Sequence, residues 1–175
     1  MSDCFERAHI AAEVRTAPGG DEIFAFEQDF AGSLRCIPMI VRFKLDLSGV
    51  KLTLRQWSRF DRRTRDALVS APCRTPEEIA AYRDLLVDAI VAQADEPVKL
   101  LEVELNPAWR DVAQVAAQVV AWAAQRGLSS PLDAQWQALS DLQRFALIKL
   151  SRPGHDNDNF YPALVEFGLV EGANT

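Results

Sequence analysis

The feature that most constrains the fold of this chain is an internal repeat. Residues 56–68 resemble residues 135–147, 79 positions later, and five of the thirteen positions are identical. Self-similarity at a fixed spacing implies two copies of one supersecondary unit. Because there are two copies only, we expect a closed domain and not an extended solenoid.

The segment before the first copy has two interpretations. Val41–Leu54 alternates apolar and polar residues around Ser48-Gly49, which is typical of a β-hairpin. The corresponding part of the second copy, with Val112, Val115, Val119 and Trp122 before Gly127, instead has the spacing of an amphipathic helix that ends at a glycine. If the copies share structure, residues 38–47 are also a helix, with Pro38 in its first turn and Gly49 as its end. We favour the helix, and the hairpin in an α+β fold remains the alternative.

Capping signals predict helices elsewhere in the chain. Thr53 with Gln56, Thr75 with Glu78 and Ser140 with Gln143 have the spacing of capping boxes. After Thr75 and Pro76, the spacing of the apolar residues predicts one buried stripe, which consists of Ile79, Tyr82, Leu85, Leu86 and Ile90. Residues 142–150 are apolar around most of a helix and should be deeply buried, and a shorter helix is expected at 162–167 before Gly168.

These signals together predict an all-α fold, a single globular domain built from two similar helical units. We expect the domain to span residues 23–170, with unit 1 at about 33–92 and unit 2 at about 110–168. Residues 95–107, between the units, should form a non-helical linker that is extended or a short strand. Residues 1–22 have neither a sustained period nor a cap, so we expect them to be loosely ordered.

Composition limits the class of protein. The chain has 175 residues, of which 49% are apolar and 25% are charged, as in soluble globular domains. The longest stretch of low charge, 112–125, is shorter than the about 20 apolar residues that a membrane helix needs. The first fifteen residues lack the apolar run of a signal peptide. Three widely spaced cysteines fit a reducing compartment, so we expect a cytoplasmic protein that does not bind membranes.

Charge is distributed unevenly along the chain. The net charge is −6, yet ten basic and three acidic residues lie between Ser33 and Arg74, which gives this segment +7. Such a segment could attract nucleic acid, an anionic ligand or an acidic partner. Arginines at helical spacing also commonly mark a solvated face or pair with carboxylates elsewhere in the chain. The candidate partner-binding residues in this segment are Arg55, Arg59, Arg62, Arg63 and Arg65.

Two tryptophans, two cysteines and a histidine have ordinary structural interpretations. Trp57 and Trp136 occupy matched positions in the repeat and are expected in the core. Cys36, Cys73 and His155 lack the close pairs of a structural zinc site, so no metal is predicted. Cys36 and Cys73 are better interpreted as small buried apolar residues.

The loop 151–159 is the most polar segment and follows the most buried helix. Arg152 and His155 in this loop could bind an anion or a partner, and Asp156 and Asp158 could bind a hard cation, although the loop lacks the glutamate and spacing of a calcium site. The loop could also simply end one helix and cap the next.

No nucleophile motif, phosphate-binding loop or nucleic-acid module is present in the sequence, so no catalytic residues, cofactors or nucleic-acid partners are predicted.

Several blocks of residues carry a family resemblance. The chain resembles the nitrate reductase associated protein family over about 24–169, and the two densest blocks are Ser33–Met39 and Gln143–His155. The further matching segments are Phe26-Glu27, 44–46, 49–52, Gln56-Trp57, Asn159-Phe160 and 166–169. The resemblance implies a small soluble protein, described mainly in cyanobacteria and other bacteria, that supports production of active nitrate reductase. Its genes tend to lie with those for assimilatory nitrate reductase and molybdenum cofactor synthesis. The resemblance to this family implies no catalytic residues.

Two functions follow from the resemblance and the residues. The first is a non-enzymatic accessory protein that binds nitrate reductase or a molybdenum-cofactor delivery protein and supports maturation of the reductase. It would act through the arginines of the basic segment and the loop with Arg152 and His155. The alternative is an anion-binding protein or enzyme in which Arg35, Arg152 and His155 converge on a small oxyanion, which arginine forks suit.

Overall fold

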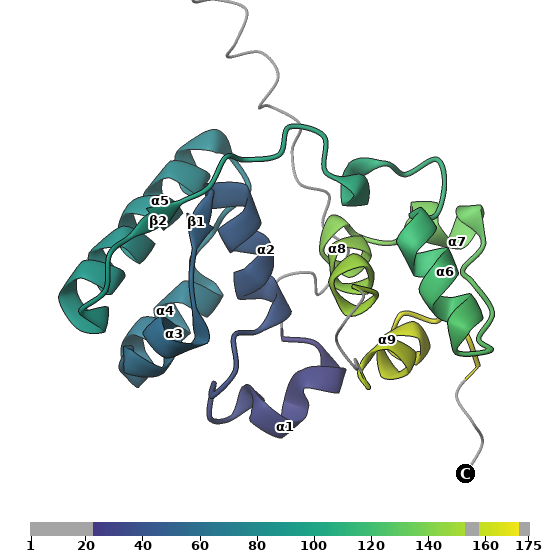
Figure 1. The fold of residues 1–175 in the computed structure, drawn as a ribbon, viewed down its shortest axis with the longest axis horizontal. Coiled ribbons are helices and arrows are strands. Elements are labelled where there is room, and N and C mark those ends of the chain that lie inside the picture. The colour runs from purple at the N-terminus through teal and green to yellow at the C-terminus, as the bar shows by residue number, and fades with distance from the viewer. Residues whose placement is uncertain (1–22, 153–157, 172–175) are drawn as a thin grey trace, which may run out of the picture. The chain divides into compact units, whose positions relative to one another are not determined.

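A computed structural model describes residues 23–152 and 158–171 of the chain. These residues are mostly helical, as the sequence predicts. They divide into two compact units (Figure 1). Unit 1 contains Glu27–Leu105, and unit 2 contains Phe24–Phe26 together with residues from Asn106 onward. The predictions for residues 1–22 and for His155 lie outside the described residues.

Unit 1 consists of five α-helices and a short two-stranded ribbon. The helices are α1 (Gln28–Ala31), α2 (Met39–Ser48), α3 (Leu54–Arg59), α4 (Arg62–Ser70) and α5 (Pro76–Ala89), which continues as a π turn (Ile90–Ala94). Strands β1 (Val50–Lys51) and β2 (Lys99–Leu100) pair in antiparallel register, with Val50 opposite Leu100. Helix α2 packs against α5, and α3 packs against the π turn.

Helix α2 decides between the two interpretations of residues 41–54. Met39–Ser48 is helical, so the predicted alternative of a hairpin within this segment is wrong. Apolar residues alternate there because the helix is buried on most of its circumference, including Val41, Phe43, Leu45 and Leu47. Gly49 ends the helix with φ 66°, the left-handed conformation that glycine adopts most easily. Pro38, predicted in the first turn, is instead the N-cap, because the helix begins one residue later at Met39.

Unit 2 is built around one deeply buried helix. Its elements are a 3-10 turn (Ala108–Arg110) followed by α6 (Ala117–Gln125), α7 (Asp133–Ala138), α8 (Asp141–Leu150) and α9 (Phe160–Glu166). Helix α8 packs against the 3-10 turn, α6 and α9. Residues 142 and 145–147 are at most 3% exposed, which confirms the predicted burial of α8. The last helix begins two residues before the predicted start at 162.

The helix predicted to include Val112 and Val115 begins later than expected. Helix α6 starts at Ala117, although Val119 and Trp122 are buried as the spacing predicts. The preceding segment forms other bonds, because the Asp111 carboxylate accepts the N–H of Ala113 and the Asp133 carboxylate accepts the N–H of Val115. These carboxylates take the place of the backbone carbonyls that would accept the same N–H groups in a helix.

The predicted caps and most of the predicted core residues agree with the structure. The capping boxes at Thr53, Thr75 and Ser140 are all formed. Trp57 and Trp136 are fully buried, and so are Tyr82, Leu86 and Ile90 of the predicted stripe on α5. Leu85, also predicted for the stripe, is 37% exposed. Cys73 is buried and Cys36 is half-buried.

Candidate partner-binding surface

The turn between α3 and α4 positions most of the predicted arginines. Thr53 begins α3, and its hydroxyl accepts the N–H of Gln56 while the Gln56 amide oxygen accepts the N–H of Thr53. Asp61 begins α4, where its carboxylate accepts the N–H of Thr64 at 2.7 Å. This bond lowers the pKa of Asp61 below its ordinary value, and the charges of Arg63 and Arg65 add to the effect. Two capped helices therefore hold the arginines in a fixed arrangement.

Four of the five candidate arginines are exposed. Arg55 has 73% of its side chain accessible, and it pairs with Glu96 at 2.9 Å. Arg62 pairs with Asp66 at 2.9 Å and also donates to the carbonyl of Gly32. Arg59 and Arg63 form no ion pair with any residue that the structure describes. We call the exposed set, Arg55, Arg59, Arg62 and Arg63, the arginine surface.

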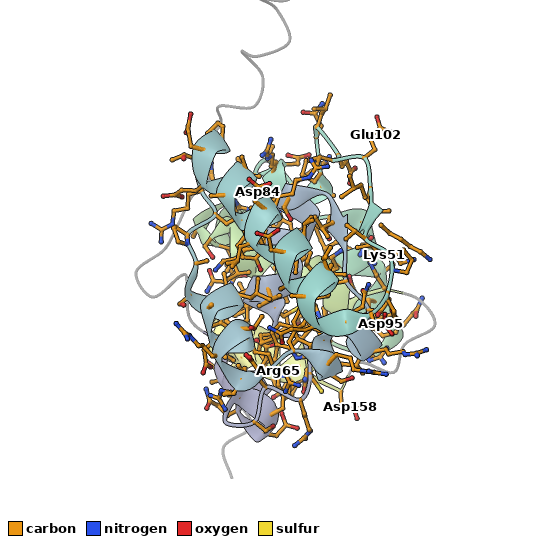
Figure 2. The ribbon with its side chains drawn as sticks, turned by 90° about the vertical axis from the view of Figure 1, so that its left-hand side faces the viewer. Lys51, Arg65, Asp84, Asp95, Glu102 and Asp158 are labelled. Carbon is orange, nitrogen blue, oxygen red and sulfur yellow. The ribbon has the colours of Figure 1, made fainter. Side chains whose placement is uncertain are left out.

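Arg65 differs from the other four, because its guanidinium holds the fold of unit 1. The side chain is half-buried on α4 (Figure 2) and donates to the carbonyls of Trp57, Ser58 and Leu34 at 3.0–3.2 Å. The guanidinium also lies over the Trp57 ring, 5.8 Å from its centroid. These bonds direct Arg65 inward.

The rest of the basic segment 33–74 is only partly a surface. Lys44 is buried and donates to the carbonyls of Val69 and Ala71, both at 2.7 Å. It therefore supplies hydrogen-bond donors to carbonyl groups at the C-terminal end of α4, which lack partners within the helix. Beside it, burial raises the pKa of the Cys73 thiol to about 12. A thiol with such a pKa stays protonated at neutral pH and is a poor nucleophile. This part of the segment is structural.

Unit 2 contains a buried ion pair that the sequence analysis did not identify. Arg144 is completely buried and donates to the carboxylate of Asp141 and to the carbonyls of Trp109, Trp136 and Leu139. The available signal was the identity of Arg65 and Arg144 in the repeat, together with the position of Arg144 inside an apolar helix. Both arginines bind the carbonyl of the tryptophan eight residues earlier.

Comparison with known protein families identifies the relatives of this chain. A family profile described as conserved nitrate reductase-associated protein matches residues 23–167. The chain belongs to this family. No curated protein and no solved structure matches the chain.

In this member of the family, the densest motif blocks include residues with structural roles. Within Ser33–Met39, Leu34 has φ 49°, an unfavourable value for a residue with a side chain, and its carbonyl accepts from both Trp57 and Arg65. The other block includes Arg144 and the buried helix α8. The matching motif acids act as caps: Glu27 accepts the N–H of Met39, and Glu166 accepts the N–H groups of Ala25 and Phe26.

Of the residues of the predicted oxyanion site, Arg35 and Arg152 belong to different units, and His155 lies outside the described residues. Arg35 lies in unit 1 and pairs with Asp29 at 3.0 Å. Arg152 lies in unit 2 just after α8 and is exposed. Among the described residues, no group of three or more His, Cys, Asp or Glu residues is placed to hold a metal ion. Within the same residues, no helix is long and apolar enough to span a bilayer.

Proposed function

We propose that this protein is a non-enzymatic accessory protein of the bacterial cytoplasm. It supports assembly or maturation of assimilatory nitrate reductase by binding the reductase or a molybdenum-cofactor delivery protein. Family membership supports the link to nitrate reductase. The observation that carries the proposed mode of action is the arginine surface, a group of exposed cations on two short capped helices.

The chemistry of the arginine surface suits an acidic protein partner. Arg59 and Arg63 have no ion-pair partner among the described residues. Arg55 already pairs with Glu96, whose side chain is only 23% exposed, so Arg59 and Arg63 are the cations most readily available to a partner carboxylate. Arginine forks bind carboxylates bidentately and accelerate association with an acidic surface. Arg152 and His155 are further candidate contacts.

The test is affinity purification of the tagged protein from its native host grown on nitrate. We expect nitrate reductase or a molybdenum-cofactor protein in the eluate, and we expect its recovery to fall as salt increases. The double variant Arg59→Glu with Arg63→Glu should abolish recovery. These two residues are chosen because neither side chain forms a hydrogen bond or ion pair with another described residue, so their replacement should leave the fold of unit 1 intact.

A matched control separates the arginine surface from net charge. Lys51→Glu with Lys99→Glu makes the same change in charge on exposed residues of the same unit. We expect this variant to recover the reductase normally. Equal loss in both double variants, or an eluate with neither the reductase nor a cofactor protein, would contradict the proposal.

The alternative, an anion-binding protein or enzyme using Arg35, Arg152 and His155, remains a separate hypothesis. Arg35 already shares its guanidinium with Asp29 and also donates to the Asp29 carbonyl, which reduces what it can offer a ligand. Calorimetric titration with nitrate and with a pterin phosphate tests it directly. Binding that is lost in Arg152→Ala would favour this alternative.

We also infer that the two helix pairs α3–α4 and α7–α8 are copies of one unit. Equivalent hydrogen bonds support this inference: each tryptophan indole donates to a distant carbonyl, that of Leu34 for Trp57 and that of Asp111 for Trp136. Exchange of residues 56–60 for 135–139 should yield a folded protein if the copies are equivalent. Loss of all helical circular dichroism in this chimaera would contradict the inference.

A further inference from the structure

The ribbon of unit 1 leaves one edge of β2 open. Leu101 donates its N–H to the Gly49 carbonyl at 2.8 Å, and Lys51 is opposite Lys99. In antiparallel pairing, the residues that bond to the neighbouring strand alternate with residues whose N–H and C=O groups point to the other side. Residues 99 and 101 therefore bond β1, and the backbone groups of Leu100 and Glu102 point away from it. No described residue pairs with that outer edge.

The segment that includes this edge is unusually exposed for its composition. Every residue from 99 to 106 is exposed, and four of them are large and apolar. Leu100 and Leu101 are 55% and 56% exposed, and Val103 and Leu105 are 39% and 67% exposed. An exposed apolar strand edge is a template for pairing with another strand, which soluble proteins usually protect.

The segment is held in place close to the backbone of unit 1. A Cβ atom at Gly49 would lie only 2.7 Å from the Leu101 carbonyl oxygen and 2.8 Å from Cγ2 of Val103. The glycine therefore allows the segment to lie directly against the end of α2. An edge fixed in this way is ready to accept a strand with little further loss of conformational entropy.

The two faces of the segment differ in chemistry. If the alternation of side chains in β2 (Lys99–Leu100) continues through residue 104, Glu102 and Glu104 share one face with Leu100, whereas Leu101 and Val103 lie on the other. In Figure 2 the Glu102 side chain projects from the extended segment, well away from Asp84 on α5. A strand that complements both faces carries basic residues against the glutamates and apolar residues against Leu101 and Val103.

A second copy of this chain fits the edge less well. A two-fold antiparallel pairing centred on residue 102 places Glu102 directly opposite its own copy. Like charges opposite each other across a strand pair are destabilising, whereas opposite charges are stabilising. The acidic face therefore selects a basic partner over self-association.

We propose that the open edge of β2 binds an extended segment of another protein in which apolar and basic residues alternate. The segment adds a third strand to the β1–β2 ribbon. Its backbone bonds to Leu100 and Glu102, and its basic side chains lie against Glu102 and Glu104. This surface is distinct from the arginine surface and opposite to it in charge, so it does not depend on the proposed accessory role.

The test uses the full-length protein and a ten-residue peptide that alternates Val and Lys. Binding is measured by calorimetry, and amide hydrogen exchange is followed by NMR. On addition of the peptide, we expect the amides of Leu100 and Glu102 to exchange at least about tenfold more slowly. The Leu101 amide, which already bonds to Gly49, should change little. Residue-specific protection distinguishes strand addition from non-specific attraction between charges.

Matched variants and a second peptide complete the experiment. We expect Glu102→Lys to weaken binding at least about tenfold, and Asp84→Lys, the same charge change on α5, to alter it by less than about twofold. A peptide with Glu in place of Lys should not bind. Equal effects of the two variants, binding without protection of Leu100 and Glu102, or a dimer of the free protein with these amides already protected would each overturn the proposal.

Discussion

Helices α3 and α4 in unit 1 and helices α7 and α8 in unit 2 share the hydrogen bonds of their turn but differ in what surrounds them. In each pair an arginine on the second helix donates to the carbonyl of the buried tryptophan on the first. Arg65 is half-buried, whereas Arg144 is completely buried and also pairs with Asp141. The hydrogen bond from arginine to the tryptophan carbonyl therefore forms at a half-buried site in unit 1 and in the core of unit 2.

The helix caps differ in a related way. In unit 2 the Gln143 side chain accepts the N–H of Ser140, so the cap of α8 is completed within its own first turn. In unit 1 Thr64 stands at the corresponding place and cannot reach back. The N–H of Asp61 instead donates to Gln93 of the π turn, and Gln93 donates to the Thr64 hydroxyl. A distant residue thus replaces a local cap.

The second helices also differ in which residues they bury. Helix α4 buries only Leu68, whereas α8 buries eight of its ten residues. At the first two positions of the helix, α4 has Arg62 and Arg63 where α8 has Asp141 and Leu142. The same turn geometry therefore leaves the outer face of the helix pair free to be either a charged surface or a packed core.

The largest expected effect comes from removal of the buried arginine. Arg144→Ala leaves the Asp141 carboxylate without this cation and deprives three carbonyls of its donors, so we expect a loss of about 3–5 kcal/mol in the free energy of unfolding. Arg65→Ala, at a half-buried site with neutral acceptors, should cost about 1–2 kcal/mol. Urea unfolding followed by circular dichroism measures both. Equal losses of unfolding free energy in the two variants would show that burial and the ion pair with Asp141 do not make Arg144 more important for stability than Arg65.

The glycines that follow α2 and α6 test how closely each unit is packed. Gly49 and Gly127 both have φ 66°, so alanine should cost about 1–2 kcal/mol at either position. Nothing lies within 4 Å of a Cβ at Gly127, whereas a Cβ at Gly49 meets the Leu101 carbonyl and Val103. We therefore expect Gly49→Ala to cost about 1–3 kcal/mol more than Gly127→Ala. Urea midpoints of the two variants check this difference.

The helix boundaries that could be predicted depend on local chemistry. Pro76 after Thr75, the Ser140 capping box and Gly49 as a helix end are signals that act within a few residues, and the structure contains all three. The hairpin alternative at 41–54 arose because burial around most of a helix leaves an alternating pattern. Comparison with the second copy was needed to prefer the helix.

What could not be predicted depends on contacts between distant residues. Residues 112–116 are not helical, and the carboxylates of Asp111 and Asp133 instead accept the N–H groups of Ala113 and Val115, which no periodicity reveals. The roles of Gln93 and Lys44 likewise require partners about 30 residues away. For the candidate surface, charge counting found the arginines, but only the coordinates separate Arg65 from the exposed four.

The difference between local and distant caps predicts a rescue. Gln93→Ala and Gln143→Ala each remove one acceptor from a helix N-cap, and we expect each to cost about 0.5–1.5 kcal/mol. Thr64→Gln should restore a local capping box in unit 1, so the double variant Gln93→Ala with Thr64→Gln should recover most of the loss. Urea unfolding of the single and double variants measures this. No recovery would mean that Gln93 stabilises unit 1 chiefly through packing of the π turn.

The smallest effect separates the two caps by pH, because Asp61 titrates and its counterpart Ser140 does not. The Thr64 N–H lowers the pKa of Asp61 in the folded state. The carboxylate therefore stabilises unit 1 above its unfolded pKa of about 4, and this contribution is lost as the pH falls through the folded value. Asp61→Asn keeps a capping oxygen without the charge. We expect its stability relative to the wild type to be lowest above about pH 5 and to rise as the pH falls below about 4. A difference that is constant from neutral to acidic pH would mean that the cap acts through the hydrogen bond alone, as Ser140 does in unit 2.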